Sequence, residues 1–138
     1  FTARTISAGW TLIWRATFHA EGEPLRFGDQ EEMGFGVRLA TPLSEQHGGQ
    51  LRNADGLETA AKTWGQPAAW CAAEGLIDGR PVGLTMVPDP QNFRGSWWHN
   101  RATGLMVANP FGRAAMKQGA PSVVVVEPGQ PLVLRCAA

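Results

Sequence analysis

The sequence lacks an excess of charge of either sign, because 12 basic residues balance 12 acidic ones and the formal net charge is zero. A nucleic-acid-binding surface without sequence preference needs a basic excess, and so does a polybasic patch that binds a membrane. The longest apolar run covers only residues 68–73, far short of the ~20 residues of a membrane-spanning helix. We therefore expect no nucleic-acid partner and no membrane span.

Motifs of metal binding and phosphate binding are also missing. The sequence has no His-x-His, His-Glu-x-x-His or paired Cys-x-x-Cys pattern, and its glycines match neither the dinucleotide nor the phosphate-loop spacing. We expect no metal and no cofactor, and no catalytic signature indicates a reaction. Cys71 and Cys136 lie far apart, which favours two buried free thiols over a disulfide. No signal peptide is visible, and periplasmic, secreted and cytoplasmic locations all stay open.

Glycine and proline are abundant, with 17 and 10 residues among 138. Together with short apolar runs they indicate strands that are joined by tight turns. The length fits one β domain over residues 1–138. Residues 6–18 alternate between apolar and polar side chains, which predicts one long half-buried strand, and residues 32–41 alternate in the same way.

Two hairpins are expected in the second half of the chain. Asp78-Gly79 fits a two-residue turn with positive φ, which would place Cys71 opposite Met86. Pro128-Gly129 fits a type II turn between strands at 122–127 and 131–136. The Val run at 123–126 does not alternate, which predicts a strand buried on both faces. Helix should be a small minority, with a turn or two within residues 57–63.

The stretch from residue 95 to residue 113 concentrates aromatic rings beside amide and guanidinium groups, which together suit a polyol ligand. The same side chains also suit a well-satisfied edge of the core. In a strand, Trp98 and Asn100 share one face, and His99 and Arg101 share the other. We expect His99 and Arg101 on a polar face that meets the ligand, with Trp98 mostly in the core. His99 is the candidate catalytic acid or base; the alternative is a structural histidine that bonds a backbone carbonyl.

Four further residues are candidates for substrate binding. Glu32 and Arg38 alternate onto one face of the expected strand, and Arg52 and Asn53 are expected nearby. Two guanidinium groups beside His99 would favour an anionic or hydroxyl-rich ligand, and like-charge repulsion would lower the pKa of the imidazole. An ordinary salt bridge is the alternative for Glu32. One or two rings of the tryptophan set are also expected to face a ligand: Trp64, Trp70, Trp97 and Trp98.

Several motifs follow one another in a fixed order: Phe35-Gly36-Val37-Arg38-Leu39, Gly48-Gly49-Gln50-Leu51-Arg52-Asn53, Trp64-Gly65, Ala69-Trp70, Trp98-His99-Asn100-Arg101, Gly104-Leu105 and Ala108-Asn109-Pro110-Phe111-Gly112. They resemble an uncharacterised bacterial β-rich family that is often called "methane oxygenase PmoA". The resemblance covers about residues 29–135. That family tends to carry Asp and Tyr at two positions where this chain has Ala102 and Thr103.

The resemblance implies a large antiparallel β-sandwich like the galactose-mutarotase supersandwich, of which this chain would be the C-terminal part. It also implies a carbohydrate-linked role and a missing N-terminal half that carries a His-His-Arg-Gly segment. If such a half is missing, an unpaired edge or apolar face should lie near residues 6–18, where a partner strand would cover it.

The sequence thus predicts an all-β antiparallel sandwich that binds or processes a sugar on a concave sheet face. The alternative is a structural or interaction domain with no small-molecule site. The two differ in whether the polar groups of residues 98–101 converge on one cavity.

Overall fold

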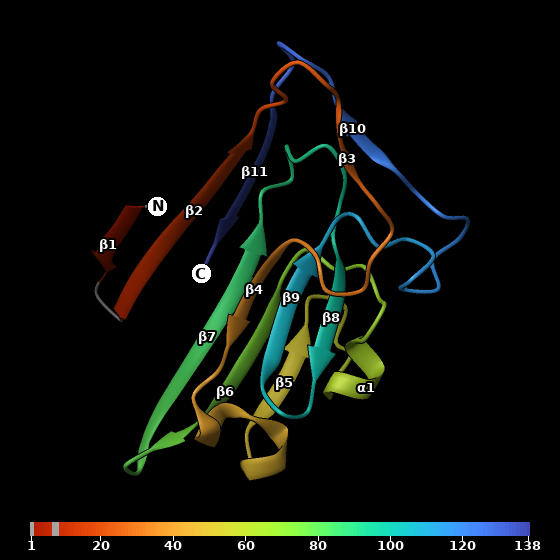
Figure 1. Ribbon diagram of the computed structural model, residues 1–138. Coiled ribbons are helices and arrows are strands. Elements are labelled where there is room, and N and C mark those ends of the chain that lie inside the picture. Colours follow the sequence, from red (N-terminus) through yellow and green to blue (C-terminus); the bar gives the residue numbers. More distant parts are fainter. Residues whose placement is uncertain (1, 7–8) are drawn as a thin grey trace.

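The computed structural model describes residues 2–6 and 9–138, and most of its regular structure is strand (Figure 1). The strands are β1 (Thr2–Ile6), β2 (Gly9–Phe18), β3 (Leu25–Phe27), β4 (Phe35–Arg38), β5 (Gln50–Asn53), β6 (Cys71–Ile77), β7 (Arg80–Pro88), β8 (Trp97–Arg101), β9 (Leu105–Asn109), β10 (Val124–Val126) and β11 (Leu132–Ala137). The short helices are the 3-10 helices η1 (Thr41–Leu43) and η2 (Glu45–His47) and the α-helix α1 (Ala60–Thr63).

The strands form a sandwich. In the described residues the larger sheet has the order β1-β2-β11-β7-β6-β5, and a smaller sheet has the order β4-β9-β8. Strands β10 and β3 form a separate ribbon. Every strand pair is antiparallel. The predicted all-β antiparallel sandwich is therefore confirmed.

The core lies between the two sheets, and alternation along each strand supplies it. Trp98 of β8 is fully buried there, and its indole Nε1 donates to the Ala68 carbonyl oxygen at 3.0 Å. Trp14 of β2 packs on Phe35 of β4 with 4.8 Å between ring centroids. The buried core residues come from both sheets: Leu51, Cys71, Ala73, Met86, Trp98, Met106, Ala108 and Cys136.

The hairpin between β6 and β7 has the predicted turn and register. Asp78 and Gly79 have φ angles of 50° and 74°, as a two-residue turn with positive φ at both positions requires. Cys71 lies opposite Met86. Both cysteines are buried free thiols, as expected.

The predicted last hairpin is wrong, because β10 and β11 do not pair with each other. A turn forms, with Gln130 N donating to the Glu127 carbonyl oxygen at 3.0 Å, but β10 continues into the ribbon with β3 while β11 lies between β2 and β7. The Val run is also not buried on both faces, since Val123 is 59% exposed and Val125 is 37% exposed. One face of a two-stranded ribbon remains in solvent, which explains the exposure.

The two long predicted strands are shorter than their alternation suggests. Residues 6–18 contain the end of β1 and all of β2, with Ile6 opposite Gly9; the part of the prediction at residues 7–8 lies outside the described residues. Residues 32–41 form strand only from Phe35 to Arg38. Gly34, with φ of 113°, lies so close to the Ala108 carbonyl oxygen that a Cβ would collide with it. The glycine therefore makes room for the neighbouring strand β9.

Candidate functional site

Strand β8 presents His99 and Arg101 on one face and Trp98 on the other, as predicted. Arg101 Nε donates to His99 Nε2 at 3.3 Å, which places the two side chains together, while Trp98 is in the core. Arg38 is on the same face, because Arg38 and Arg101 both pair with Leu105 of β9. The polar face of the smaller sheet therefore gathers an imidazole and two guanidinium groups.

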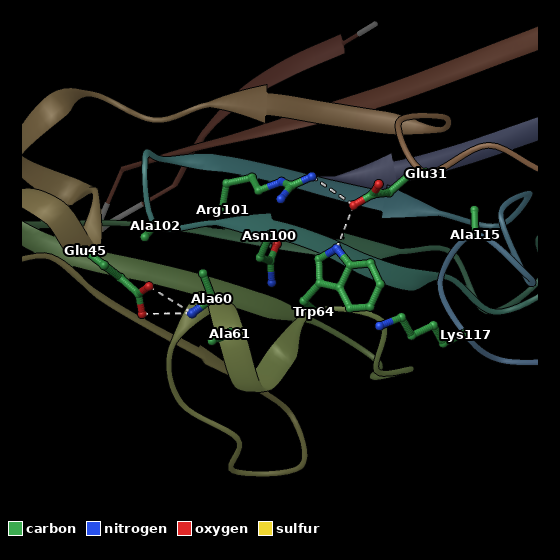
Figure 2. A pocket seen from close by; sticks show the side chains of 10 residues that line it. All are labelled: Glu31, Glu45, Ala60, Ala61, Trp64, Asn100, Arg101, Ala102, Ala115 and Lys117. Atoms are coloured by element: carbon green, nitrogen blue, oxygen red, sulfur yellow. Dashed lines mark hydrogen bonds and ion pairs between the residues drawn. The ribbon is translucent and has the colours of Figure 1, made fainter.

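A carboxylate that the sequence analysis did not select contacts two of these groups, His99 and Arg101. Glu31 Oε1 accepts hydrogen bonds from Trp64 Nε1 and from Arg101 Nη2, both at 2.9 Å (Figure 2). The same oxygen lies 3.0 Å from His99 Nδ1. The distance between these two atoms fits an ion pair, but the N–H bond does not point at the oxygen. His99 Nδ1 therefore makes no hydrogen bond with the described residues. Glu31 thus links Arg101 of β8 to the indole of Trp64, which follows α1 in the sequence.

His99 is buried and neutral at physiological pH. Its side chain has 0% exposure, and burial lowers its pKa below the ordinary value of 6.5, with Arg101 acting in the same direction and Glu31 and Glu32 opposing it. Because Nε2 accepts from Arg101, the proton of the neutral ring is on Nδ1. The predicted direction of the pKa shift is confirmed, although desolvation and not like-charge repulsion is its main cause.

The backbone of Glu31 is fixed by Asn109, a fully buried residue at the end of β9. Asn109 Nδ2 donates to the carbonyl oxygens of Gln30 and Glu31 at 2.7 and 2.8 Å. Its Oδ1 accepts from the backbone N–H groups of Phe111 and Gly112 at 2.8 and 3.0 Å. All four hydrogen bonds are internal, so this side chain sets the position of the carboxylate.

Asp29 fixes the loop that forms the opposite wall. Its carboxylate accepts from the backbone N–H groups of Ala114, Ala115 and Ser122 at 2.9, 2.8 and 2.7 Å. Partial burial raises the pKa of Asp29, but these hydrogen bonds outweigh it and hold the pKa below the ordinary 3.8. The loop therefore holds Lys117 beside Trp64, with Nζ 5.4 Å from the ring centroid.

An open cavity of about 680 Å³, shallow and largely exposed to solvent, lies between these elements. Figure 2 shows Trp64 near its middle, with Glu31 and Arg101 on one side and Lys117 on the other. Asn100 lies at its back, where Nδ2 donates to Thr63 Oγ1 at 2.9 Å and Oδ1 is buried with no hydrogen-bond partner among the described residues. The lining residues are Glu31, Glu45, Ala60, Ala61, Trp64, Asn100, Arg101, Ala102, Ala115 and Lys117.

The N-terminus of α1 closes the far end of the cavity. Both carboxylate oxygens of Glu45 accept from the Ala60 N–H at 2.9 Å, and the side-chain oxygen of Thr59 caps the Lys62 N–H. These hydrogen bonds satisfy N–H groups that lack a partner within the helix. They orient the short helix so that Trp64, which follows it directly, points at Glu31.

The residues predicted from the sequence lie in four different places. Arg101 lines the cavity, and His99 lies behind it with Glu32 Oε1 3.7 Å from its Nε2. Trp98 is buried in the core and has no surface for a ligand. Arg38 is exposed on the same sheet face.

Arg52 and Asn53 belong to β5 of the other sheet, away from this cavity. Arg52 Nη2 donates to Glu74 Oε1 at 2.8 Å, and the buried Asn53 accepts from the N–H groups of Asp55 and Leu57 to shape a turn. Both side chains therefore have structural partners of their own, and neither lines the cavity; their predicted role in ligand binding stays a prediction.

The residues that sequence reasoning missed are Glu31, Glu45 and Lys117. Glu31 and Glu32 both precede β4, and the assumed strand assigned the polar face to Glu32. The irregular segment before β4 instead turns Glu31 toward β8. Only the contact between segments distant in sequence distinguishes the two carboxylates. Trp64 was one of four rings considered, and no local pattern separates it from the others.

Two classes of function are not indicated by the described residues. In residues 2–6 and 9–138, no group of three or more His, Cys, Asp or Glu side chains is placed to hold a metal ion. None of the helices in that part of the chain has the length and apolar character that crossing a membrane requires.

Comparison with known proteins identifies a family but no characterised relative. Residues 1–138 match a family of unknown function, DUF6807. Neither the curated proteins nor the solved structures include a match. Like the β-rich family that the motifs resemble, this family is uncharacterised. Nothing in the match supports a methane oxygenase.

Proposed function

Since the chain belongs to DUF6807, a family of unknown function, we propose from its own geometry that the cavity around Trp64 binds a neutral saccharide. The observation that carries the proposal is the arrangement of one half-buried indole, held by Glu31, beside exposed polar groups that converge on one cavity. Aromatic faces cover the C–H faces of a sugar ring, and carboxylate and guanidinium groups bond its hydroxyls.

The size and charge of the cavity favour this class of ligand. About 680 Å³ is within the range of small-ligand sites. Two carboxylates, Glu31 and Glu45, balance two cations, Arg101 and Lys117, in the lining. An anion would meet as much repulsion as attraction there, which favours a neutral hydroxyl-rich ligand over an anionic one.

The first ligand contacts follow from the groups that remain free. The contacts of Glu31 with Trp64, His99 and Arg101 all use Oε1, which leaves Oε2 as an acceptor for a hydroxyl. The Arg101 side chain is 50% exposed, so its remaining N–H groups can donate. The ammonium of Lys117 covers part of the Trp64 ring, and a sugar that stacks on that face would replace it.

We propose that this site binds a saccharide, and we assign no reaction to it. His99 has no exposed surface, so it would act on a bound sugar through Glu31 and Arg101. Its catalytic role stays a prediction. The alternative is an interaction domain without a small-molecule site, and a binding experiment decides between the two.

A glycan array with three proteins tests the proposal. The unmodified chain should bind at least one class of neutral saccharide, and Trp64→Ala should weaken that binding by about tenfold or more, the equivalent of about 1.4 kcal/mol. Trp10→Ala removes an indole that is 73% exposed and outside the cavity, so it should bind as the unmodified chain does. Failure of the unmodified chain to bind any glycan, or equal binding by Trp64→Ala, would reject the proposal.

A further inference from the structure

Asn100 of β8 has a buried polar atom without a partner on the wall of the cavity around Trp64. The residue lines the back of that cavity and is only 2% exposed; in Figure 2 its side chain lies between Ala60 and Trp64. Its Nδ2 donates to Thr63 Oγ1 at 2.9 Å and to Cys71 Sγ at 3.3 Å. Its Oδ1 has no partner among the described residues. Because the large majority of buried polar atoms are hydrogen-bonded, this atom points to a group that the cavity receives.

The orientation of the Asn100 amide follows from the atoms around it. Thr63 Oγ1 donates its proton to the Thr59 carbonyl oxygen at 2.8 Å. Cys71 Sγ donates its proton to the Arg52 carbonyl oxygen at 3.3 Å. Both atoms have used their only proton, so they can accept from Asn100 but cannot donate to it. The amide nitrogen must therefore face them, and the unpaired atom is the oxygen, whose complement is a hydrogen-bond donor.

The backbone of Asn100 offers a further donor and a further acceptor. Two residues earlier, the Trp98 N–H donates to the Gln66 carbonyl oxygen at 3.1 Å, and the Trp98 carbonyl oxygen accepts from the Gly65 N–H at 2.8 Å. Both bonds lie on the side of β8 that faces away from β9. Backbone groups repeat their direction at every second residue of a strand. The N–H and carbonyl oxygen of Asn100 therefore also point away from β9, toward α1 and the cavity.

The segment that covers this edge of β8 ends before it reaches Asn100. Gly65 and Gln66 pair with the edge at Trp98, but the residues before them form α1. Among the described residues, the hydrogen bonds outside the strand ladders include none from the Asn100 N–H and none to its carbonyl oxygen. Asn100 thus brings one unpaired donor and two unpaired acceptors to the wall of the cavity, and buried groups of this kind need partners.

The number and spacing of these groups favour one class of ligand group. The N and O atoms of one extended residue lie roughly 3 Å apart by standard backbone geometry, and two adjacent gauche hydroxyls of a sugar ring have nearly the same separation. One hydroxyl can accept from the N–H, and the two hydroxyl protons can go to the two acceptors. An ammonium group cannot accept from the N–H, a carboxylate brings no proton for the acceptors, and a lone hydroxyl brings only one.

We propose that Asn100 recognises a vicinal diol, a gauche pair of hydroxyls on adjacent ring carbons of the saccharide. This inference rests on the proposed function, because a ring that stacks on Trp64 presents its edge to β8. The diol binds the backbone N–H and carbonyl oxygen of Asn100, and Oδ1 accepts the remaining hydroxyl proton. Asn100 therefore determines specificity, since a sugar that lacks either hydroxyl leaves buried polar groups without partners.

The test uses two isomers that differ only in the spacing of their hydroxyls. The hydroxyls of trans-1,2-cyclohexanediol are adjacent and gauche in its diequatorial form, and those of trans-1,4-cyclohexanediol are on opposite carbons. Each is titrated into the 138-residue chain to about 100 mM, since ligands of this size bind weakly, while NMR follows the backbone amide and indole N–H signals. We expect the 1,2 isomer to shift the Asn100 amide signal and to bind at least about threefold more tightly than the 1,4 isomer.

Two matched substitutions locate the diol, with the Trp64 indole signal as the measure of binding. Asn100→Ala removes Oδ1 and should weaken binding of the 1,2 isomer by about threefold or more. Asn53→Ala, at a residue that is also 2% exposed but does not line the cavity, should leave binding within about twofold. Equal effects of the two substitutions would overturn the proposal. The comparison of the two isomers in the unmodified chain needs neither variant to fold.

The position of the shifted signals separates this inference from the proposed function. Equal binding of the two isomers, with shifts at Trp64 and none at the Asn100 amide, would overturn the diol and leave the stacking cavity in place. An Asn100 amide signal that neither isomer moves would show that water alone meets its polar groups, which also overturns the proposal. The glycan array decides separately whether the cavity binds a saccharide.

Discussion

Asn109 Nδ2 donates to the backbone carbonyl oxygen of Glu31 at 2.8 Å, although 78 residues separate the two in the sequence. Through this hydrogen bond the turn after β9 determines where the carboxylate of Glu31 lies, and Glu31 in turn holds Trp64 and Arg101. The cavity therefore depends on a buried amide that does not line it.

Replacement of Asn109 should lower stability more than its size suggests. Asn109→Ala removes a fully buried side chain with four hydrogen bonds to backbone groups. Because some of these groups would stay buried without a partner, we expect a loss of roughly 2–4 kcal/mol in the free energy of unfolding. Asn92→Ala, at a partly exposed residue with two hydrogen bonds to Arg135, is the control and should cost about 1 kcal/mol. Urea unfolding measures both, and equal losses would contradict the account.

The buried His99 should make stability depend on pH. Its pKa is lowered in the folded chain, mainly by burial, while the unfolded chain takes up the proton near the ordinary 6.5. Between these two values the unfolded state binds more protons, so the free energy of unfolding falls as the pH falls below 6.5 and levels off below the folded pKa. His99→Gln should remove this part of the slope.

The exposed His19 offers a matched control. The free energy of unfolding of His19→Gln should fall with pH below neutrality in the same way as that of the unmodified chain. A His99→Gln variant whose unfolding free energy has the same pH dependence as that of His19→Gln would show that His99 is not the group that titrates.

The two thiols should be inert in the folded protein. Burial raises the pKa of Cys71 to about 11 and that of Cys136 to about 12, and the thiolate is the reactive form. A thiol reagent at about pH 8 should therefore label neither cysteine until a denaturant unfolds the chain, and then both. Fast labelling of either thiol under native conditions would contradict the burial of the core around β6 and β11.

Local chemistry determined which features could be predicted from the sequence. Asp78-Gly79 encodes its own turn, and alternation alone places His99 and Arg101 opposite Trp98. Neither signal reports which strands meet, so the pairing of β11 with β2 could not be predicted from the turn at Pro128-Gly129.

The site was harder to predict because its parts come from distant segments. Glu31 precedes β4, Trp64 follows α1 and Lys117 lies in the loop after β9. Each is unremarkable within its own segment, and only the contacts between the segments select them. Arg52 and Asn53 were expected near the site, but they belong to β5 of the larger sheet and do not line the cavity.

The most direct test of the saccharide proposal is a titration followed through the indole N–H signals in a two-dimensional NMR spectrum. The chain has six tryptophans, and the Trp64 Nε1–H is the one bonded to Glu31. Titration with the saccharide that the array selects should shift the Trp64 signal most, because ring stacking and hydroxyl contacts at Glu31 both change its surroundings. The signals of Trp98, buried in the core, and Trp10, exposed outside the cavity, should stay in place. Binding that leaves the Trp64 signal unchanged, or that shifts only another indole, would contradict the account.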